Sequence, residues 1–291
     1  MQARTSVVLR LLLVLLSLLA MAGCRNGIRS DELDTLPVED LYKAGSTTLD
    51  NGNFDRAERY LKRLSARFPF GSYNEQAQLK LAYAQYRLDK YDEALATTNR
   101  FIKTYPTHPH VDYAYYVRGL VNFDRNRGLL NTLIPGDDAL RDQQTAKQSF
   151  LDFSELLKRY PNSKYAGDSR QRMLYLRNNL ATHDLAIAKY YLRRGAYVGA
   201  LNRAKHIVET FQETPMAADA LAIMVECYRV LDEAALAADT LEVLKLNAPD
   251  HPYLSGEVER KRSWLRRLWP FGRDEGERAA ASDLRASEQP G

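Results

Sequence analysis

The side chains in this sequence that are best suited to bind a metal ion or to act in catalysis are five histidines and two cysteines. His108 and His110 flank Pro109, and no other two histidines lie as close in the sequence. A shared metal ion is one interpretation, but zinc sites usually use cysteines or helix-spaced histidines, and Asp112 is the only carboxylate nearby. We therefore favour a surface or capping role for the pair, and we expect neither a metal site nor a cofactor.

Motifs for catalysis are missing from the sequence. It contains no Gly-x-Ser-x-Gly nucleophile turn and no glycine-rich phosphate loop. The formal net charge is +4, and Arg4 and Arg10 near the N-terminus account for half of it, which is too balanced for a nucleic-acid partner. The sequence therefore predicts a binding protein rather than an enzyme, and a cryptic hydrolase is the catalytic alternative.

The N-terminal end has the pattern of a secretory leader that stops at a cysteine. Basic residues precede an apolar run over residues 11–20, and the small residues Ala22 and Gly23 lead to Cys24. The run is shorter than the about 20 apolar residues that a membrane-spanning helix needs. This pattern predicts a signal peptide over residues 1–23.

Residues 21–24 resemble the lipobox of bacterial lipoproteins, with Met21 in place of the usual leucine. The resemblance implies that Cys24 is acylated, and three acyl chains hold a protein firmly on a bilayer. Enterobacterial lipoproteins kept in the inner membrane usually have aspartate after the cysteine, whereas this chain has Arg25. We therefore expect a lipid anchor in the periplasmic leaflet of the outer membrane. An ordinary secretory leader with a chance cysteine is the alternative.

The rest of the sequence has a repeated helical pattern. Pro69 and Pro106 each follow an aromatic residue, and their spacing is close to the period of about 34 residues in tetratricopeptide repeats. Small residues such as Gly45, Ala57 and Ala94 recur where two paired helices must approach closely. No alternating strand pattern is present. The sequence predicts an all-α tetratricopeptide-repeat solenoid of about five helix pairs.

The expected organisation has five parts along the chain. They are a signal peptide (1–23), a lipidated tether (24–37), the solenoid (38–255), a basic amphipathic helix (256–272) and a disordered tail (273–291). The solenoid comprises N-terminal repeats (38–123), an insertion (124–143) and C-terminal repeats (144–255). We also expect an added helix near residues 167–181, which either completes the third helix pair or joins it to the fourth. Leucines of the insertion could dock a partner or tuck under the solenoid. The basic helix could bind an anionic membrane or another subunit, but we favour a capping helix with a solvated basic face.

Aromatic residues occupy positions that face the groove in tetratricopeptide geometry, where the first helices of each pair form a concave binding wall. They are Tyr42, Tyr83, Tyr86, Tyr113, Tyr116 and Phe123. Any one of them could equally belong to the core. Several on one wall favour a peptide groove, because tyrosine combines apolar area with a hydroxyl and loses little rotamer freedom. We predict that this wall binds a peptide with an aromatic end.

Four stretches of the sequence resemble the BamD family, the tetratricopeptide lipoproteins of the outer-membrane β-barrel assembly machinery. They are residues 67–73, residues 107–113 with 118–120, residues 160–165, and residues 194–197 with 202–203. The resemblance runs from Cys24 to about Pro249. It implies three kinds of partner: the periplasmic domains of the insertase BamA, smaller lipoproteins of the same complex, and unfolded barrel proteins recognised by a C-terminal aromatic signal.

The resemblance also implies that the C-terminal repeats face BamA. Arg194 and Arg203 are then expected to contact its acidic side chains, because a planar guanidinium pairs with a carboxylate through two hydrogen bonds. From the residues alone, a solvated helix face is the favoured alternative. A different function class is a periplasmic scaffold for peptidoglycan enzymes or competence functions, since tetratricopeptide lipoproteins also organise cell-wall enzymes.

Overall fold

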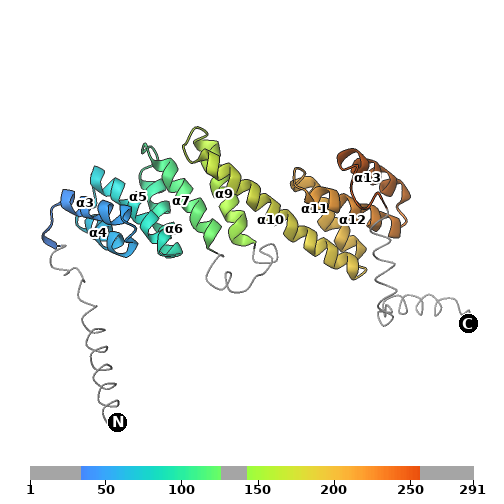
Figure 1. The fold of residues 1–291 in the computed structure, drawn as a ribbon, viewed down its shortest axis with the longest axis horizontal. Coiled ribbons are helices and arrows are strands. Elements are labelled where there is room, and N and C mark those ends of the chain that lie inside the picture. The colour runs from blue at the N-terminus through green and yellow to red at the C-terminus, as the bar shows by residue number, and fades with distance from the viewer. Residues whose placement is uncertain (1–33, 126–142, 256–291) are drawn as a thin grey trace, which may run out of the picture. The chain divides into compact units, whose positions relative to one another are not determined.

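The computed structural model describes residues 34–125 and 143–255, and in these ranges it contains ten α-helices and no strand (Figure 1). None of the described helices is both long and apolar enough to cross a membrane. Cys24, Arg25, the signal peptide, most of the insertion and the basic C-terminal helix lie outside the described residues. The chain divides into two compact units, Met1–Arg118 and Gly119–Gly291.

The described part of the first unit, residues 34–118, consists of two helix pairs and the start of a third. Its helices are α3 (Val38–Asp50), α4 (Phe54–Arg67), α5 (Ser72–Arg87), α6 (Tyr91–Thr104) and the beginning of α7 (Val111–Asp124). Helix α5 packs against α3, α4 and α6. The fully buried Leu41, Leu61 and Leu64 lie in the apolar core between α3, α4 and α5. This contiguous burial of one face per helix is the main stabilising term of such a unit.

The second unit contains the end of α7 and five further helices. They are α9 (Gln144–Arg159), α10 (Ala166–Arg193), α11 (Tyr197–Thr210), α12 (Met216–Val230) and α13 (Ala234–Asn247). Helix α10 has 28 residues and packs against α9, α11 and α12. The added helix expected near residues 167–181 is therefore the first half of α10, and it runs without a break into the first helix of the fourth pair. The described helices form the all-α tetratricopeptide fold that the repeats predict.

The turns inside four of the helix pairs share one backbone geometry. A residue with positive φ lies two positions before each second helix: Gly52 (74°), Asp89 (56°), Gly195 (73°) and Asp232 (59°). Glycine adopts this left-handed conformation without cost, and aspartate tolerates it better than most side chains. After Gly52, the side chain of Asn53 caps α4 by accepting a hydrogen bond from the Arg56 backbone at 3.1 Å.

Helices α7 and α9 are in contact through Gly119. A Cβ atom added at this position would lie 2.5 Å from the ring of Phe153, which is fully buried. The Gly119 carbonyl also accepts a hydrogen bond from the Ser149 hydroxyl at 3.0 Å. Nearby, the Asn122 side chain donates to Asp152 at 2.6 Å. The close approach of the two helices therefore depends on the missing side chain at Gly119.

A buried carboxylate links consecutive repeats in the first unit. Glu58 of α4 is 4% exposed and pairs with Lys62 at 2.8 Å and with Lys90, just before α6, at 2.5 Å. Burial by itself raises the pKa of Glu58, but the two ammonium groups outweigh it, and the pKa lies below its ordinary value. The first helix pair thus holds the turn of the second through an ionised Glu58.

We predict that Gly119→Ala lowers the free energy of unfolding by about 1–3 kcal/mol, because the new methyl group overlaps the Phe153 ring in a core that cannot shift freely. Gly167→Ala is the matched control, since nothing lies within 4 Å of a Cβ atom built there in α10. Its stability should be unchanged or slightly raised. Chemical denaturation followed by circular dichroism measures both, and equal stability of the two variants would contradict the close contact.

We also predict that Glu58→Gln lowers the free energy of unfolding at neutral pH by about 2 kcal/mol, because Lys90 loses its pairing with an ionised carboxylate and Lys62 keeps only that with Glu93. The lowered pKa of Glu58 means that its contribution is complete above the ordinary glutamate range and is lost as the pH falls through the folded-state value. The difference between variant and wild type should therefore shrink in acid. Glu209→Gln, on the exposed side of α11, is the control. A difference that does not vary with pH would rule out the ionised pair.

Candidate functional site

Three of the predicted groove tyrosines, Tyr83, Tyr86 and Tyr113, lie close together, with Tyr83 at the centre. The ring centroid of Tyr83 in α5 lies 6.2 Å from Phe54, 6.1 Å from Tyr86 and 6.5 Å from Tyr113. The three tyrosines are half-buried, so each ring keeps part of its surface in solvent. The spacings and tilted angles are those of favourable aromatic contacts. Residues from α4, α5 and α7 thus form one aromatic surface.

Arg87 adds a positive charge to these rings. Its guanidinium donates to the Tyr83 hydroxyl at 2.9 Å and lies 4.4 Å from the centre of the Phe54 ring and 5.8 Å from that of Tyr83. Arg87 is exposed, so its remaining donors face solvent. We call Phe54, Tyr83, Tyr86, Arg87 and Tyr113 the Tyr83 cluster. It combines aromatic area with a cation that can pair with a carboxylate.

Tyr42, another predicted groove residue, lies in a separate aromatic pair of the first unit. Its ring centroid is 5.4 Å from that of Tyr73, and its hydroxyl donates to Gln76 at 2.7 Å. The Lys80 ammonium group lies 5.6 Å from the centre of the Tyr42 ring. Tyr42 therefore resembles the Tyr83 cluster in chemistry, with rings next to a cation.

The last two predicted groove residues lie on α7. Tyr116 is half-buried in the first unit. Phe123 belongs to the second unit, where its ring is 5.6 Å from Tyr175 and 6.5 Å from Phe153. The Arg172 guanidinium lies 4.8 Å from the centre of the Phe123 ring. Phe123 is thus part of an aromatic cluster of the second unit.

Sequence reasoning missed two members of the Tyr83 cluster. Phe54 belongs to a second helix, α4, and a search restricted to first helices does not include it. Arg87 could have been found, because it lies four residues after Tyr83 and therefore on the same face of α5. The contact with Phe54 depends on how α4 and α5 pack together, which the spacing of residues along one helix does not reveal.

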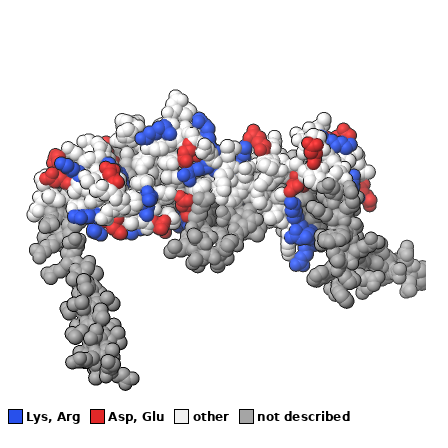
Figure 2. Space-filling view, in the orientation of Figure 1, with Lys and Arg blue, Asp and Glu red and all other residues white. Residues whose placement is uncertain are grey.

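The two arginines expected at a partner interface do not form one cluster. Arg203 of α11 donates to Asp184 of α10 at 3.2 Å, and Asp184 is largely buried. Arg194 lies beyond the last turn of α10, with its guanidinium 5.3 Å from the centre of the Tyr190 ring. Asp184 and Arg194 are ten residues apart, about 15 Å along a helix. Figure 2 shows positive side chains gathered near the C-terminal end of α10.

The His108 and His110 pair has a structural role in the turn before α7. The Nδ1 atom of His108 accepts a hydrogen bond from the His110 backbone at 3.0 Å, and its ring packs on Phe101 with centroids 5.2 Å apart. Its Nε2 atom lies 3.6 Å from the Glu75 carboxylate. His108 thus stabilises the turn before α7 through its own ring. Among the residues that the structure describes, no three His, Cys, Asp or Glu side chains are grouped to hold a metal ion.

Comparison with known proteins identifies related chains. The outer membrane protein assembly factor BamD of Xylella fastidiosa (strain 9a5c) is 40% identical over 272 residues, which cover 94% of this chain and 92% of that protein. BamD of Neisseria gonorrhoeae is 42% identical over 218 residues, 75% of this chain and 82% of that protein. BamD of Vibrio cholerae (strain ATCC 39315 / El Tor Inaba N16961) is 39% identical over 233 residues, 80% of this chain and 96% of that protein.

A family model agrees with these relatives. The model of the outer membrane lipoprotein family YfiO matches residues 34–244, which include α3 to α12 and most of α13. The match covers more than half of the chain, and the BamD proteins are similar over most of its length. The resemblance seen in the sequence motifs is confirmed. The chain therefore belongs to the YfiO family of outer membrane lipoproteins, together with the BamD assembly factors.

Proposed function

We propose that this protein is a non-catalytic component of the outer-membrane β-barrel assembly machinery. It binds unfolded outer-membrane proteins through their C-terminal aromatic signal and couples them to BamA. Membership of the YfiO family supports the outer membrane as its location, and the names of the BamD relatives support the role in assembly. The observation in this chain that carries the proposal is the Tyr83 cluster.

The Tyr83 cluster fits a peptide that ends in an aromatic residue. Such a chain end presents a flat apolar ring next to a terminal carboxylate. The rings of Phe54, Tyr83 and Tyr113 offer edges and faces for the ligand ring. Arg87, already held on these rings, offers its remaining donors to the carboxylate. Because Arg87 is positioned before the ligand arrives, little side-chain entropy is lost on binding.

Two further features complete the proposal. Acylation of Cys24 anchors the protein in the periplasmic leaflet of the outer membrane, and residues 24–37 are the tether between the lipid and the repeats. The C-terminal repeats bind the periplasmic domains of BamA, with Arg194 and Arg203 in contact with acidic side chains. Arg194 supports this assignment because it is exposed at the end of α10 and engages a tyrosine ring rather than a carboxylate. Other lipoproteins of the complex bind the same chain.

We predict that Tyr83→Ala weakens binding of a peptide ending in phenylalanine by about tenfold or more, because the ring at the centre of the cluster and the anchor for Arg87 are both lost. Adding Tyr86→Ala should weaken binding further. Fluorescence anisotropy of a labelled peptide measures the affinity, and circular dichroism should stay unchanged.

The control for this test is Tyr190→Ala, which removes an exposed tyrosine from the second unit. A second peptide with a C-terminal amide should bind wild type less tightly than the free acid, because Arg87 then has no carboxylate to pair with. Equal affinity of wild type and the Tyr83 variants for the acid peptide would exclude the Tyr83 cluster as the binding site.

We predict that Arg194→Glu and Arg203→Glu each weaken binding to the periplasmic domains of BamA by about tenfold, because reversing the charge replaces attraction by repulsion. Arg203 also pairs with Asp184 inside the chain, so Asp184→Asn is its control. This control releases Arg203 without removing it, and binding should persist. If both reversed variants bind BamA as wild type does in a calorimetric titration, these arginines are not at the interface.

A further inference from the structure

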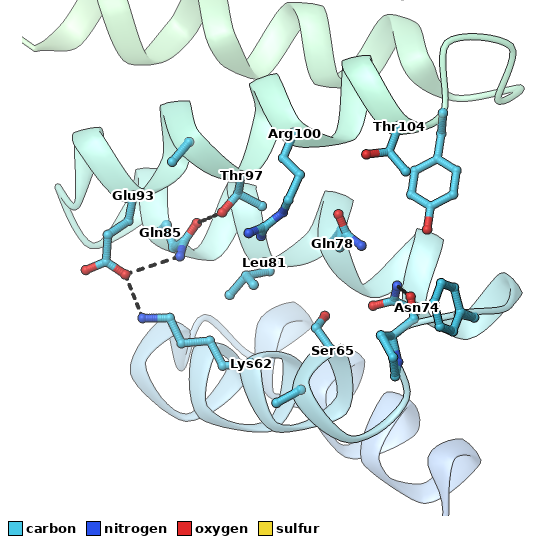
Figure 3. A pocket seen from close by; sticks show the side chains of 15 residues that line it. Lys62, Ser65, Asn74, Gln78, Leu81, Gln85, Glu93, Thr97, Arg100 and Thr104 are labelled. Carbon is cyan, nitrogen blue, oxygen red and sulfur yellow. Dashed lines mark hydrogen bonds and ion pairs between the residues drawn. The ribbon is translucent and has the colours of Figure 1, made fainter.

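The first unit contains a pocket on the side of α5 that faces away from the Tyr83 cluster. Its volume is about 600 Å³, and it is lined by residues of α4, α5 and α6 (Figure 3). The floor is a stripe of α5 formed by Asn74, Gln78, Leu81 and Gln85, which the helical period places on one face. Tyr83 comes two residues after Leu81, half a helical turn away. The two surfaces therefore lie on opposite sides of α5.

A buried amide oxygen without a partner lies in the floor of this pocket. Gln78 is 8% exposed, and its Oε1 atom accepts no hydrogen bond from any described residue. A primary amide has two donor hydrogens and an acceptor oxygen, and burial without partners is unfavourable. The terminal torsion of glutamine is soft, so the amide can turn to meet a ligand. A peptide group matches it well, because it offers an N–H and a C=O side by side.

Asn74 provides a second acceptor at the same end of the floor. It is 1% exposed, and its Nδ2 atom donates to the Pro69 carbonyl at 2.6 Å, which fixes the orientation of the amide. Its Oδ1 atom accepts no hydrogen bond within the described chain. The Ser65 hydroxyl, across the pocket on α4, is likewise buried and unpaired there. Three polar groups at one end of the pocket thus have no partner among the residues that the structure describes.

The other end of the pocket is saturated by internal contacts. Gln85 accepts from the Thr97 hydroxyl at 2.8 Å and donates to Glu93 at 3.3 Å. Glu93 in turn pairs with Lys62 at 2.6 Å, which also binds Glu58. Figure 3 shows this chain of contacts from α4 across α5 to α6. The charges at this end therefore balance each other.

Arg100 supplies a charge that these contacts do not balance. It reaches from α6 across the pocket toward α5 (Figure 3), and it forms no ion pair or hydrogen bond with the described residues. Its guanidinium can pair with a carboxylate through two hydrogen bonds. Phe70, which is 87% exposed, lines the pocket together with Leu81 and Ala96 and adds apolar surface for side chains.

We propose that this pocket binds an extended segment of a partner polypeptide that has an aspartate or glutamate side chain within it. The amide of Gln78 pairs with a backbone peptide group, Asn74 accepts a second N–H, and Arg100 binds the carboxylate. The floor from Asn74 to Gln85 is about 16 Å long, which accommodates about five extended residues. This length suits a segment that passes through the pocket, and the site is independent of the Tyr83 cluster across α5.

The test uses the purified full chain and three pools of hexapeptides with mixed residues other than aspartate and glutamate at all but one position. The first pool has aspartate fixed at the third position and blocked ends. The second has asparagine there and blocked ends. The third has asparagine there and a free C-terminal carboxylate. Retention of each pool on immobilised protein measures binding, and the wild type should retain the aspartate pool about tenfold better than the blocked asparagine pool.

The variants separate the parts of the proposal. Arg100→Gln should remove the preference for aspartate, whereas Arg170→Gln, on the exposed side of α10, should keep it. Gln78→Leu should reduce retention of both blocked pools severalfold, because the partner of the backbone is lost. Circular dichroism and thermal unfolding of each variant establish that it is folded.

Three results would overturn the proposal. The first is equal retention of the two blocked pools by wild type, and the second is a preference for aspartate that survives Arg100→Gln in a folded protein. The third is a free-acid asparagine pool retained as well as the aspartate pool, since Arg100 would then bind a chain end and not an internal side chain. If Tyr83→Ala loses the preference for aspartate while Arg100→Gln keeps it, the Tyr83 cluster is the binding site. This outcome overturns the proposal in the same way as the second result.

Discussion

The two helices of each repeat pack closely, and this packing limits the side chains that the fold can hold between them. Four second helices have an alanine as their fourth residue, and each alanine is almost fully buried: Ala57, Ala94, Ala200 and Ala237. On the first helix of the first pair, a Cβ atom added at Gly45 would lie 2.9 Å from Leu61 of the second helix. Larger side chains at these positions would push the helices apart and expose the leucines of the core. The short turns with positive φ are compatible with the same close approach.

This packing also determines which surfaces remain available for binding. Helix α5 contacts α3, α4 and α6, so its residues either enter the core or appear on one of two remaining sides. One side presents Tyr83 with its aromatic neighbours and Arg87, and the other presents the polar stripe that includes Gln78. The two sides of α5 differ in chemistry because the neighbouring helices contribute different side chains to each. Phe54 and Tyr113 add rings to the first, whereas Thr97 and Arg100 add polar and charged groups to the second.

Much of the fold follows from local patterns in the sequence. The prolines after aromatic residues and the recurring small residues such as Gly45, Ala57 and Ala94 predict helix pairs, and the structure contains them. The continuous α10 was less predictable, because nothing in a helical period states whether two adjacent helices are joined. Left-handed backbone at Asp89 and Asp232 was also missed, because aspartate adopts it less often than glycine and gives no comparable signal.

The candidate site likewise has one part that follows from the sequence and another part that does not. Helical spacing correctly puts Tyr83 and Tyr86 on neighbouring positions of α5, and family resemblance pointed to the assembly factors before any contact was known. The helices, their small contact residues and the family follow from the sequence, because these depend on neighbours in the chain and on motifs of a few residues. The contact of Tyr83 with Phe54, the pairing of Arg203 with Asp184 and the place of Gln78 in a pocket beside Arg100 emerge only when the helices pack together. These contacts join different helices, and the spacing along one helix cannot fix how two helices are rotated against each other.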